Sequence, residues 1–215
     1  MSAFAVLVAN IKGGCGKTTI ATHLAAAFAA AGRQTVLADV DRQRSSLGWL
    51  ERRPASAALL TGLDWTRELG GAVRGADRLV IDAPAALKTR QIEDLVHLAD
   101  LIVLPVLPGA FDEQATRRFL TKLDELKPIA RNKKSVAVVG NRVRSHTRGA
   151  DRLDSFLNEI GHTVVTRLRD SQIYPDVAAT GLSIFDVPGK RAGSFRTDWE
   201  PLLTFIENVG SVRQP

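Results

Sequence analysis

A glycine-rich stretch near the start of the chain carries the strongest chemical signal in the sequence. It reads Lys12-Gly13-Gly14-Cys15-Gly16-Lys17-Thr18-Thr19. Glycines let the backbone turn tightly, so that successive N–H groups converge on one anion, and a helix that starts there adds unpaired N–H donors. Lys17 supplies a positive charge for phosphates and Thr18 a hydroxyl for Mg²⁺. The spacing therefore predicts a loop that holds the phosphates of a nucleoside triphosphate.

The loop departs from the usual phosphate-binding pattern at its first position. That pattern has Gly five residues before the last Gly of the loop, whereas Ile11 stands there and Lys12 directly precedes the double glycine. A second lysine is thus available next to the phosphates. Cys15 is the single cysteine of the chain, and we expect it to fill space in the loop rather than to sense redox state.

Acidic side chains follow two of the apolar segments. Asp39 and Asp41 come directly after the run 34–38, and Asp82 ends the run 78–82. In an open α/β sheet, ligands bind in the crevice at the carboxyl ends of the strands, where a carboxylate reaches Mg²⁺ directly or through water. Asp41 is also placed to cap a helix expected over 42–53, and the two roles are compatible.

The remaining pattern predicts the elements that position these residues. Strands are expected at 4–9, 34–38, 78–82, 101–107, 135–140 and 163–166, with a short edge strand at 57–60. Helices are expected at 20–31, 42–53, 65–73, 87–98, 115–126, 151–160, 171–179 and 198–209, and a polar loop at 188–194. Strands that alternate with helices predict an α/β fold, a doubly wound and mostly parallel sheet flanked by helices. We expect one domain over residues 1–215.

Composition restricts the class of protein. The 215 residues are 45% hydrophobic, and the mean hydropathy is −0.02. No apolar run approaches the ~20 residues that a membrane-spanning helix needs, and the N-terminal residues lack the pattern of a secretory signal. One cysteine forms no internal disulfide, which suits a reducing compartment. These observations lead us to expect a cytoplasmic protein.

Taken together, the motifs resemble the ParA/MinD family of deviant Walker A ATPases. The segments that carry the resemblance are the loop 12–19, Asp39-Val40-Asp41-Arg42-Gln43, Val80-Ile81-Asp82-Ala83-Pro84, the run 99–106 and Gly140-Asn141-Arg142-Val143. Within the family the sequence is similar to the short ParA-like proteins that position plasmids, chemoreceptor arrays or other cargo. The resemblance implies a P-loop ATPase that uses ATP and Mg²⁺, turns over slowly, and is stimulated by a cargo-associated activating protein.

The resemblance also implies a role for each matched residue. Lys12 would reach the phosphates of the partner subunit in an ATP-bound homodimer, where a transition state rich in negative charge gains from an inserted cation. Asp41 would orient or activate the attacking water, alongside the catalytic charges of Lys12 and Lys17. The nucleotide would be held by Gly13, Gly14, Cys15, Gly16, Lys17, Thr18, Thr19 and, at the adenine, Asn141. The metal would be surrounded by Thr18, Asp39 and Asp82.

Two positions depart from the family pattern. Arg42 stands where Pro is usual, and Ala83-Pro84-Ala85 follows Asp82 where Thr-Pro-Pro is common. A lost hydroxyl and a lost second proline would alter the outer shell of the metal or the switch after this strand. They bear on the turnover rate more than on the fold.

Positive charge is concentrated in one part of the chain. The formal net charge is +6, and segment 127–152 holds a single acid among the cations Lys127, Arg131, Lys133, Lys134, Arg142, Arg144, Arg148 and Arg152. Such a surface suits non-specific binding to the phosphates of double-stranded DNA, although basic runs are often only solvated faces. Because short ParA-like proteins use this half of the chain for DNA, the resemblance implies nucleoid association. The candidate contacts are Arg142, Arg144, Arg148, Arg152, Arg167 and Arg169.

Other proteins on the same fold supply the alternatives. A MinD-like membrane-associated ATPase needs a C-terminal amphipathic helix with cations on its polar face, whereas the last expected helix carries Asp198, Glu200 and Glu207. Its apolar stripe is therefore expected in the core, with no integral membrane contact. Metal-cluster enzymes need cysteine ligands beyond the loop, which this chain lacks. An ATP-dependent biosynthetic enzyme is the weaker alternative, because amidotransferase-type synthetases usually carry an additional domain.

Overall fold

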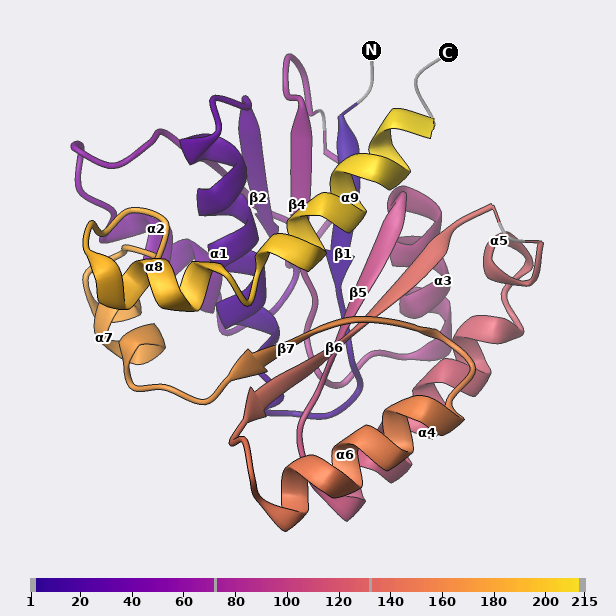
Figure 1. The fold of residues 1–215 in the computed structure, drawn as a ribbon. Helices are drawn as coiled ribbons and strands as arrows, with labels where there is room; N and C mark the ends of the chain where they lie inside the picture. Colours follow the sequence, from indigo (N-terminus) through magenta and orange to yellow (C-terminus); the bar gives the residue numbers. More distant parts are fainter. Residues whose placement is uncertain (1–2, 72, 132, 213–215) are drawn as a thin grey trace.

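A single parallel sheet forms the centre of the molecule (Figure 1). The computed structural model describes residues 3–71, 73–131 and 133–212. Within them seven strands pair in the order β3-β2-β4-β1-β5-β6-β7, and every neighbouring pair is parallel. The strands are β1 Phe4–Val8, β2 Thr35–Asp39, β3 Thr61–Asp64, β4 Arg78–Asp82, β5 Leu101–Val106, β6 Ser135–Val143 and β7 Thr163–Arg169. The predicted doubly wound parallel sheet is confirmed.

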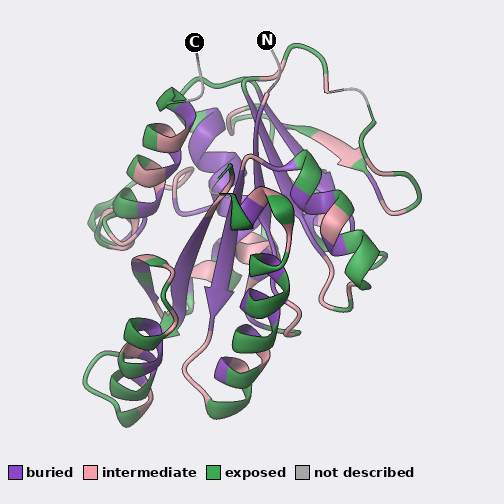
Figure 2. Ribbon diagram, turned by 90° about the vertical axis from the view of Figure 1, so that its right-hand side faces the viewer, coloured by how far each residue is buried: buried purple, intermediate pink, exposed green. Residues whose placement is uncertain are grey.

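Helices cover both faces of this sheet. They are α1 Lys17–Ala30, α2 Ser45–Glu51, α3 Thr89–Leu98, α4 Ala110–Asp124, α5 Lys127–Ala130, α6 Arg148–Glu159, α7 Ile173–Ala179, α8 Lys190–Arg196 and α9 Glu200–Val212. Buried side chains of α3, α4 and α6 belong to one core, and those of α1, α2, α7, α8 and α9 to the other. Figure 2 shows the central strands buried between helices whose outer sides are exposed.

The apolar runs of the sequence form the central strands because both faces of the sheet are covered. In β1, Leu7 packs into the core beneath α3, α4 and α6, whereas Val6 and Val8 pack into the core beneath α1 and α9. Side chains alternate between the faces of a strand, so a strand covered on both sides must be apolar at every position. This arrangement brings the carboxyl ends of β1, β2 and β4 to one edge.

The C-terminal helix belongs to the core, as its apolar stripe predicts. Leu202 and Ile206 of α9 are fully buried, and Gly210 lies against the ring of Phe4. Among the described residues, no helix is both long and apolar enough to cross a bilayer.

The helix expected over 65–73 is wrong. Residues 65–71 and 73 form no helix, and residue 72 lies outside the described part of the chain. Trp65 is buried in the core, and its backbone N–H donates to the carbonyl of Asp39 at 2.9 Å. Gly70 has φ +83°, a conformation that ends a right-handed helix. Contacts with the sheet therefore override the local helical pattern.

Two further expectations about elements are corrected. The edge strand lies at Thr61–Asp64 rather than at 57–60, because residues 61–64 pair with residues 36–39 of β2. Part of the polar loop expected at 188–194 is helical, since α8 begins at Lys190. That helix is held by Ala192, which is buried, and by Arg196, whose Nη1 donates to the carbonyls of Ile184 and Val187 at 3.0 Å.

Candidate functional site

The loop between β1 and α1 turns around the end of the Lys17 side chain. Lys17 Nζ donates to the carbonyl of Lys12 at 2.9 Å. Gly14 and Gly16 have φ +76° and +93°, backbone angles that residues other than glycine rarely adopt. A Cβ on Gly16 would lie 2.2 Å from Asn141 Nδ2, so this position also lacks room for a side chain. The structure thus brings the predicted glycines and Lys17 together in one cradle.

The first residue of this cradle is held by Asn10, whose functional place the sequence reasoning missed. The buried Asn10 Nδ2 donates to the carbonyl of Pro105 at 2.8 Å and to Thr116 Oγ1 at 3.2 Å. Its Oδ1 accepts from the backbone N–H of Lys12 at 3.1 Å. A polar residue at the end of a buried apolar strand was the available signal. These bonds fix the start of the loop to β5 and α4.

Cys15 lies inside the loop. Its thiol donates to the carbonyl of Lys12 at 3.3 Å. Burial raises the pKa of Cys15 above its ordinary value, while the charge of Lys17 acts in the opposite direction. The protonated form is therefore favoured, which suits a residue that packs in the loop.

Asp82 is the buried acid of the site. It is 1% exposed, and neither of its carboxylate oxygens has a hydrogen-bond partner among the described residues. Burial raises its pKa to about 7, with a further increase from the charge of Asp39, while the nearby side chains of Thr18, Ser46 and Lys17 oppose the rise. A buried carboxylate without donors calls for an explanation such as a bound ion. The donor set therefore fits a hard divalent cation.

Asp39 holds the segment that carries Asp41. Its Oδ1 accepts from the backbone N–H of Asp41 at 2.9 Å. Its Oδ2 accepts from the N–H and Oγ of Ser46, at 3.0 and 2.7 Å, and from the N–H of Leu47 at 3.2 Å. Because Ser46 and Leu47 lie in the first turn of α2, Asp39 satisfies the start of that helix. The interpretation of Asp41 as the cap is wrong, because the helix begins only at Ser45.

Asp41 itself lies half-buried in the turn between β2 and α2. Its Oδ1 accepts from the N–H of Gln43 at 3.0 Å, and its carbonyl accepts from the N–H of Arg44 at 2.8 Å. Arg44 pairs with Asp64 at 3.2 Å and has φ +51°. The turn is thus ordered by its own backbone, with one Asp41 carboxylate oxygen bonded locally.

The residues predicted to surround the metal do not form a cage of protein side chains. In the described ranges, no group of three or more His, Cys, Asp or Glu side chains is arranged to hold a metal ion. Mg²⁺ is usually bound by one or two carboxylates together with substrate phosphates and water. Asp82, with Thr18 beside it, fits that description better than a dedicated all-protein site.

A cavity of about 580 Å³ opens beside the first turn of α1. Its walls come from α1, from the ends of β6 and β7 and from α7, and include Thr19, Ile20, Asn141, Arg142, Arg144, Asp170, Gln172, Tyr174, Pro175, Ala178 and Trp199. Asn141 Nδ2 donates to the carbonyl of Cys15 at 2.8 Å, and its Oδ1 accepts from the N–H of Arg142 at 3.0 Å. Asn141 therefore joins the cavity to the loop, where its predicted adenine contact would lie. The size and mixed lining suit a base with its ribose.

Three aromatic side chains, which sequence reasoning did not connect, form a layer at this cavity. Trp199 and Tyr174 line it, and Trp199 Nε1 donates to Tyr174 Oη at 3.2 Å. His23 stacks on Trp199 with ring centroids 5.3 Å apart, and its Nδ1 donates to the carbonyl of Thr19 at 2.8 Å. Burial lowers the pKa of His23 to about 4, so the ring is neutral at pH 7. No local pattern links positions 23, 174 and 199.

The six arginines predicted to contact DNA are not equivalent in the structure. Four pair with acids: Arg144 with Asp170 at 2.7 Å, Arg152 with Glu113 at 2.8 Å, Arg169 with Asp198 at 2.7 Å, and Arg167 with Asp154. Arg142 and Arg144 line the cavity. Arg148 is exposed at the start of α6, and among the described residues its side chain has no hydrogen bond or ion pair. The DNA surface stays a prediction.

Most of the chain resembles a known nucleotide-binding domain. Residues 6–184 match the model of the CobQ/CobB/MinD/ParA nucleotide binding domain. The maintenance of carboxysome distribution protein A of Halothiobacillus neapolitanus is 28% identical over 211 residues, which cover 95% of this chain and 96% of that protein. The protein of the same name from Gloeobacter kilaueensis is 40% identical over 114 residues, half of each chain.

Solved structures share the fold. A variant of Cyanothece McdA in complex with ATP has a TM-score of 0.73 at 15% identity, covering 99% of this chain and 98% of its own. The MinD cell division protein of Aquifex aeolicus has a TM-score of 0.71 at 17% identity, covering 94% and 97%. At these identities the likeness concerns the fold alone.

Proposed function

The chain belongs to the CobQ/CobB/MinD/ParA nucleotide-binding family, and on that premise we propose that it is an ATP-hydrolysing switch that dimerises with ATP and positions a cargo over DNA. The observation that carries the proposal is Asp82, whose buried carboxylate has no hydrogen-bond partner among the described residues, with Thr18 and Lys17 nearby. A module that binds no metal would gain nothing from an unsatisfied buried acid. A site for a metal–phosphate complex would.

The nucleotide would lie across the loop and the cavity. The loop N–H groups and Lys17 bind phosphates, and the cavity beside Asn141 takes the base. Because Asn141 is bonded to the carbonyl of Cys15, the two halves of the site have a fixed spacing. Bound Mg²⁺ would neutralise charge on the phosphates between Thr18 and Asp82. Lys17 Nζ has three N–H donors, and one of them is directed at the carbonyl of Lys12. The others remain available for phosphate oxygens.

Asp41 is the residue that we assign to the attacking water. Its turn lies at the carboxyl edge of β2, and Asp39 holds its backbone at 2.9 Å. A water next to a positioned carboxylate is oriented and loses its proton more readily. Asp82 is less suited to this role, since it is buried and would be occupied by the metal.

Lys12 is the residue that we assign to the partner subunit. Its backbone is held by Asn10 and Lys17, while among the described residues nothing bonds its Nζ. A cation with a fixed backbone and an unpaired ammonium group, at the rim of the phosphate cradle, suits contact with phosphates across a two-fold axis. The proposed active form is a homodimer that encloses two nucleotides.

The closed dimer would join two basic surfaces into one DNA-binding face. Two joined surfaces bind more phosphates than one, which raises affinity and steepens its salt dependence. Hydrolysis, stimulated by a protein on the cargo, would then release the dimer from the nucleoid in the cytoplasm. The names of two relatives favour a carboxysome-like protein compartment as the cargo.

A titration of non-specific duplex DNA at one fixed salt concentration tests this proposal. The protein should bind tightly with ATP and Mg²⁺ and weakly with ADP or without nucleotide. Equal binding in all three states would contradict the switch. Flotation with anionic liposomes in ATP is the parallel arm, and binding there without DNA binding would support the membrane-associated alternative instead.

A further inference from the structure

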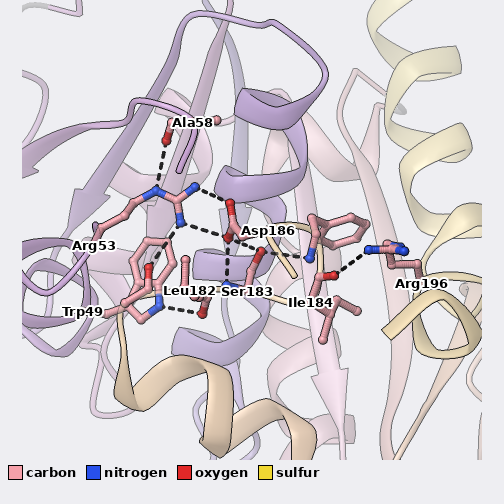
Figure 3. A network of polar contacts seen from close by, with 10 residues as sticks. Trp49, Arg53, Ala58, Leu182, Ser183, Ile184, Asp186 and Arg196 are labelled. Atoms are coloured by element: carbon pink, nitrogen blue, oxygen red, sulfur yellow. Dashed lines mark hydrogen bonds and ion pairs between the residues drawn. The ribbon is translucent and has the colours of Figure 1, made fainter. Parts of the chain in front are cut away.

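A buried ion pair links the end of α2 to the segment after α7. Arg53 follows α2, and Asp186 follows α7, 133 positions later in the chain; Figure 3 shows the pair with its surroundings. Arg53 Nη2 donates to Asp186 Oδ1 at 2.6 Å, and Nη1 donates to Oδ2 at 3.0 Å. The side chains are 5% and 4% exposed. Such a pair has a fixed geometry because two N–H groups of the planar guanidinium donate to the two oxygens of one carboxylate.

The contacts around this pair bring two backbone segments together. Arg53 Nη1 also donates to the carbonyl of Gly181 at 3.2 Å, and Trp49 Nε1 donates to the carbonyl of Leu182 at 3.1 Å (Figure 3). Gly181 has φ +72°, and a Cβ there would lie 2.4 Å from the backbone of Arg52 and Arg53. The turn after α7 therefore lies directly against the end of α2.

The opposite end of α2 is bonded to Asp39 of the site. Asp39 Oδ2 accepts from Ser46 and Leu47, and Asp39 Oδ1 accepts from Asp41. The helix is only seven residues long. A rotation or shift of α2 would consequently change the position of Asp41.

The turn after α7 is bonded to the wall of the cavity. The N–H of Leu182 donates to the carbonyl of Val177 at 3.0 Å, and the N–H of Gly181 donates to that of Ala178 at 3.2 Å. Ala178 and Tyr174 of α7 line the cavity. A movement of this wall would consequently move the turn that carries Asp186.

We propose that Arg53 and Asp186 are a positioning pair that couples occupancy of the base cavity to the placement of Asp41, an inference that rests on the proposed ATPase function. The base adjusts α7, the ion pair transmits the adjustment to α2, and α2 sets the Asp41 turn for the attack of water. Neither residue of the pair lines the cavity. A buried ion pair adds little stability over apolar residues of similar volume, whereas its directional bonds fix one relative orientation of the two segments.

The test compares ATP, which carries an adenine base, with inorganic triphosphate, which carries none. The double variant Arg53→Met/Asp186→Leu leaves no buried charge unpaired, and hydrolysis of ATP and of inorganic triphosphate is measured with Mg²⁺. Wild type should show a kcat for ATP at least about tenfold above that for triphosphate. In the double variant the ATP kcat should fall to within about threefold of the triphosphate value, while the affinity for ADP changes by less than about threefold.

Two controls separate coupling from a loss of packing. Arg78→Met/Glu207→Leu removes another ion pair, between β4 and α9, in which Arg78 Nη2 donates to both carboxylate oxygens of Glu207 at 2.8 and 2.7 Å. This variant should leave both kcat values unchanged. If Arg53→Met/Asp186→Leu does not fold, Asp186→Asn, which keeps the shape of the side chain, is measured in the same way and should lower the ATP kcat.

The outcomes distinguish a failure of the proposed ATPase function from a failure of the proposed coupling by the ion pair. Wild type that hydrolyses neither substrate overturns the proposed function and the inference together. Wild type with equal kcat for both substrates overturns the inference alone. So does a folded pair variant that keeps the wild-type kcat for ATP.

Discussion

Asp39 and Asp82 lie opposite each other in register on the neighbouring strands β2 and β4, yet their carboxylates differ in bonding. Asp39 accepts hydrogen bonds from Asp41, Ser46 and Leu47, whereas both oxygens of Asp82 lack a partner among the described residues. The environment thus separates two adjacent acids into one that orders the loop and one whose oxygens are left for the proposed cation.

Mg²⁺ affinity should depend on pH through Asp82. Burial and the charge of Asp39 raise its pKa to about 7, so below pH 7 a proton occupies the carboxylate and competes with the metal. Without nucleotide, the affinity should rise about tenfold per pH unit between pH 5 and 7 and then level off. Titration with Mg²⁺ by calorimetry across this range measures it, and Asp82→Asn should remove the dependence. An affinity independent of pH in the wild type would contradict the assignment.

Stability without metal should depend on pH in the opposite direction. The folded pKa of Asp82 lies above its ordinary value, so its contribution is largest below about pH 4 and is lost as the pH rises to about 7. Asp82→Asn should therefore raise the free energy of unfolding at pH 8, on the order of 1–3 kcal/mol, by removing a buried unpaired charge. Urea unfolding at pH 8 with EDTA measures the change. Glu125→Gln, at an exposed acid, is the control and should leave stability unchanged; a destabilised Asp82→Asn protein would contradict the argument.

Local patterns explain why much of the site was predictable from the sequence. The glycine loop follows an apolar strand, and Asp39, Asp82 and Asn141 lie near the carboxyl ends of three others. Parallel strands bring these ends to one edge. The segment 65–73 was not predictable in this way. Its helical periodicity competes with a hydrogen bond from Trp65 to Asp39 and with burial of the Trp65 ring, and neither contact is visible in a local window.

Long-range contacts account for the other residues that sequence reasoning missed. Arg53 and Asp186 are separated by 133 positions. Arg53 follows another arginine and Asp186 stands among apolar residues, and neither local pattern indicates the pairing. The layer of His23, Tyr174 and Trp199 joins three distant elements. Such contacts depend on how α1, α7 and α9 pack on the sheet, which only the structure provides.

Lys12→Ala should reduce ATP hydrolysis about 100-fold, because one positive charge is removed from the charged transition state. The Lys12 backbone bonds to Asn10 and Lys17 do not involve its side chain, so affinity for ADP should stay within about threefold of wild type. Sedimentation should show a monomer with ATP where wild type is a dimer. Lys122→Ala, on the exposed side of α4, is the matched control. A Lys12→Ala protein that dimerises and hydrolyses ATP like wild type would refute the trans role.

Asp41→Ala should bind ATP and dimerise but hydrolyse it at least about 100-fold more slowly, since the water loses its positioned base. The protein should accumulate in the ATP-bound state and stay on DNA. Asp41 accepts from the N–H of Gln43, so circular dichroism is needed to show that the turn and fold persist. Filter binding of labelled ATP and DNA measures the trapped state. Undiminished hydrolysis would move the catalytic role to another residue.

Arg148 gives the cleanest test of the DNA surface among the six arginines. Arg144→Glu should weaken DNA binding. Because Arg144 pairs with Asp170 and lines the cavity, this change would also affect nucleotide binding. Arg148 is exposed at the start of α6, and Arg148→Glu replaces a positive charge with a negative one away from the loop. Its expected effects are an about tenfold weaker affinity for duplex DNA and a decrease of about 1 in the slope of log affinity against log salt.

Two further measurements decide what such a loss at Arg148 means. ATP-driven dimerisation of Arg148→Glu should be unchanged, which separates a lost phosphate contact from a lost switch. Lys122→Glu makes the same change of charge on α4, and as a control it should affect DNA binding less, because only the general field is altered. Equal losses in the two variants would indicate that net charge, rather than a defined surface at α6, attracts the DNA.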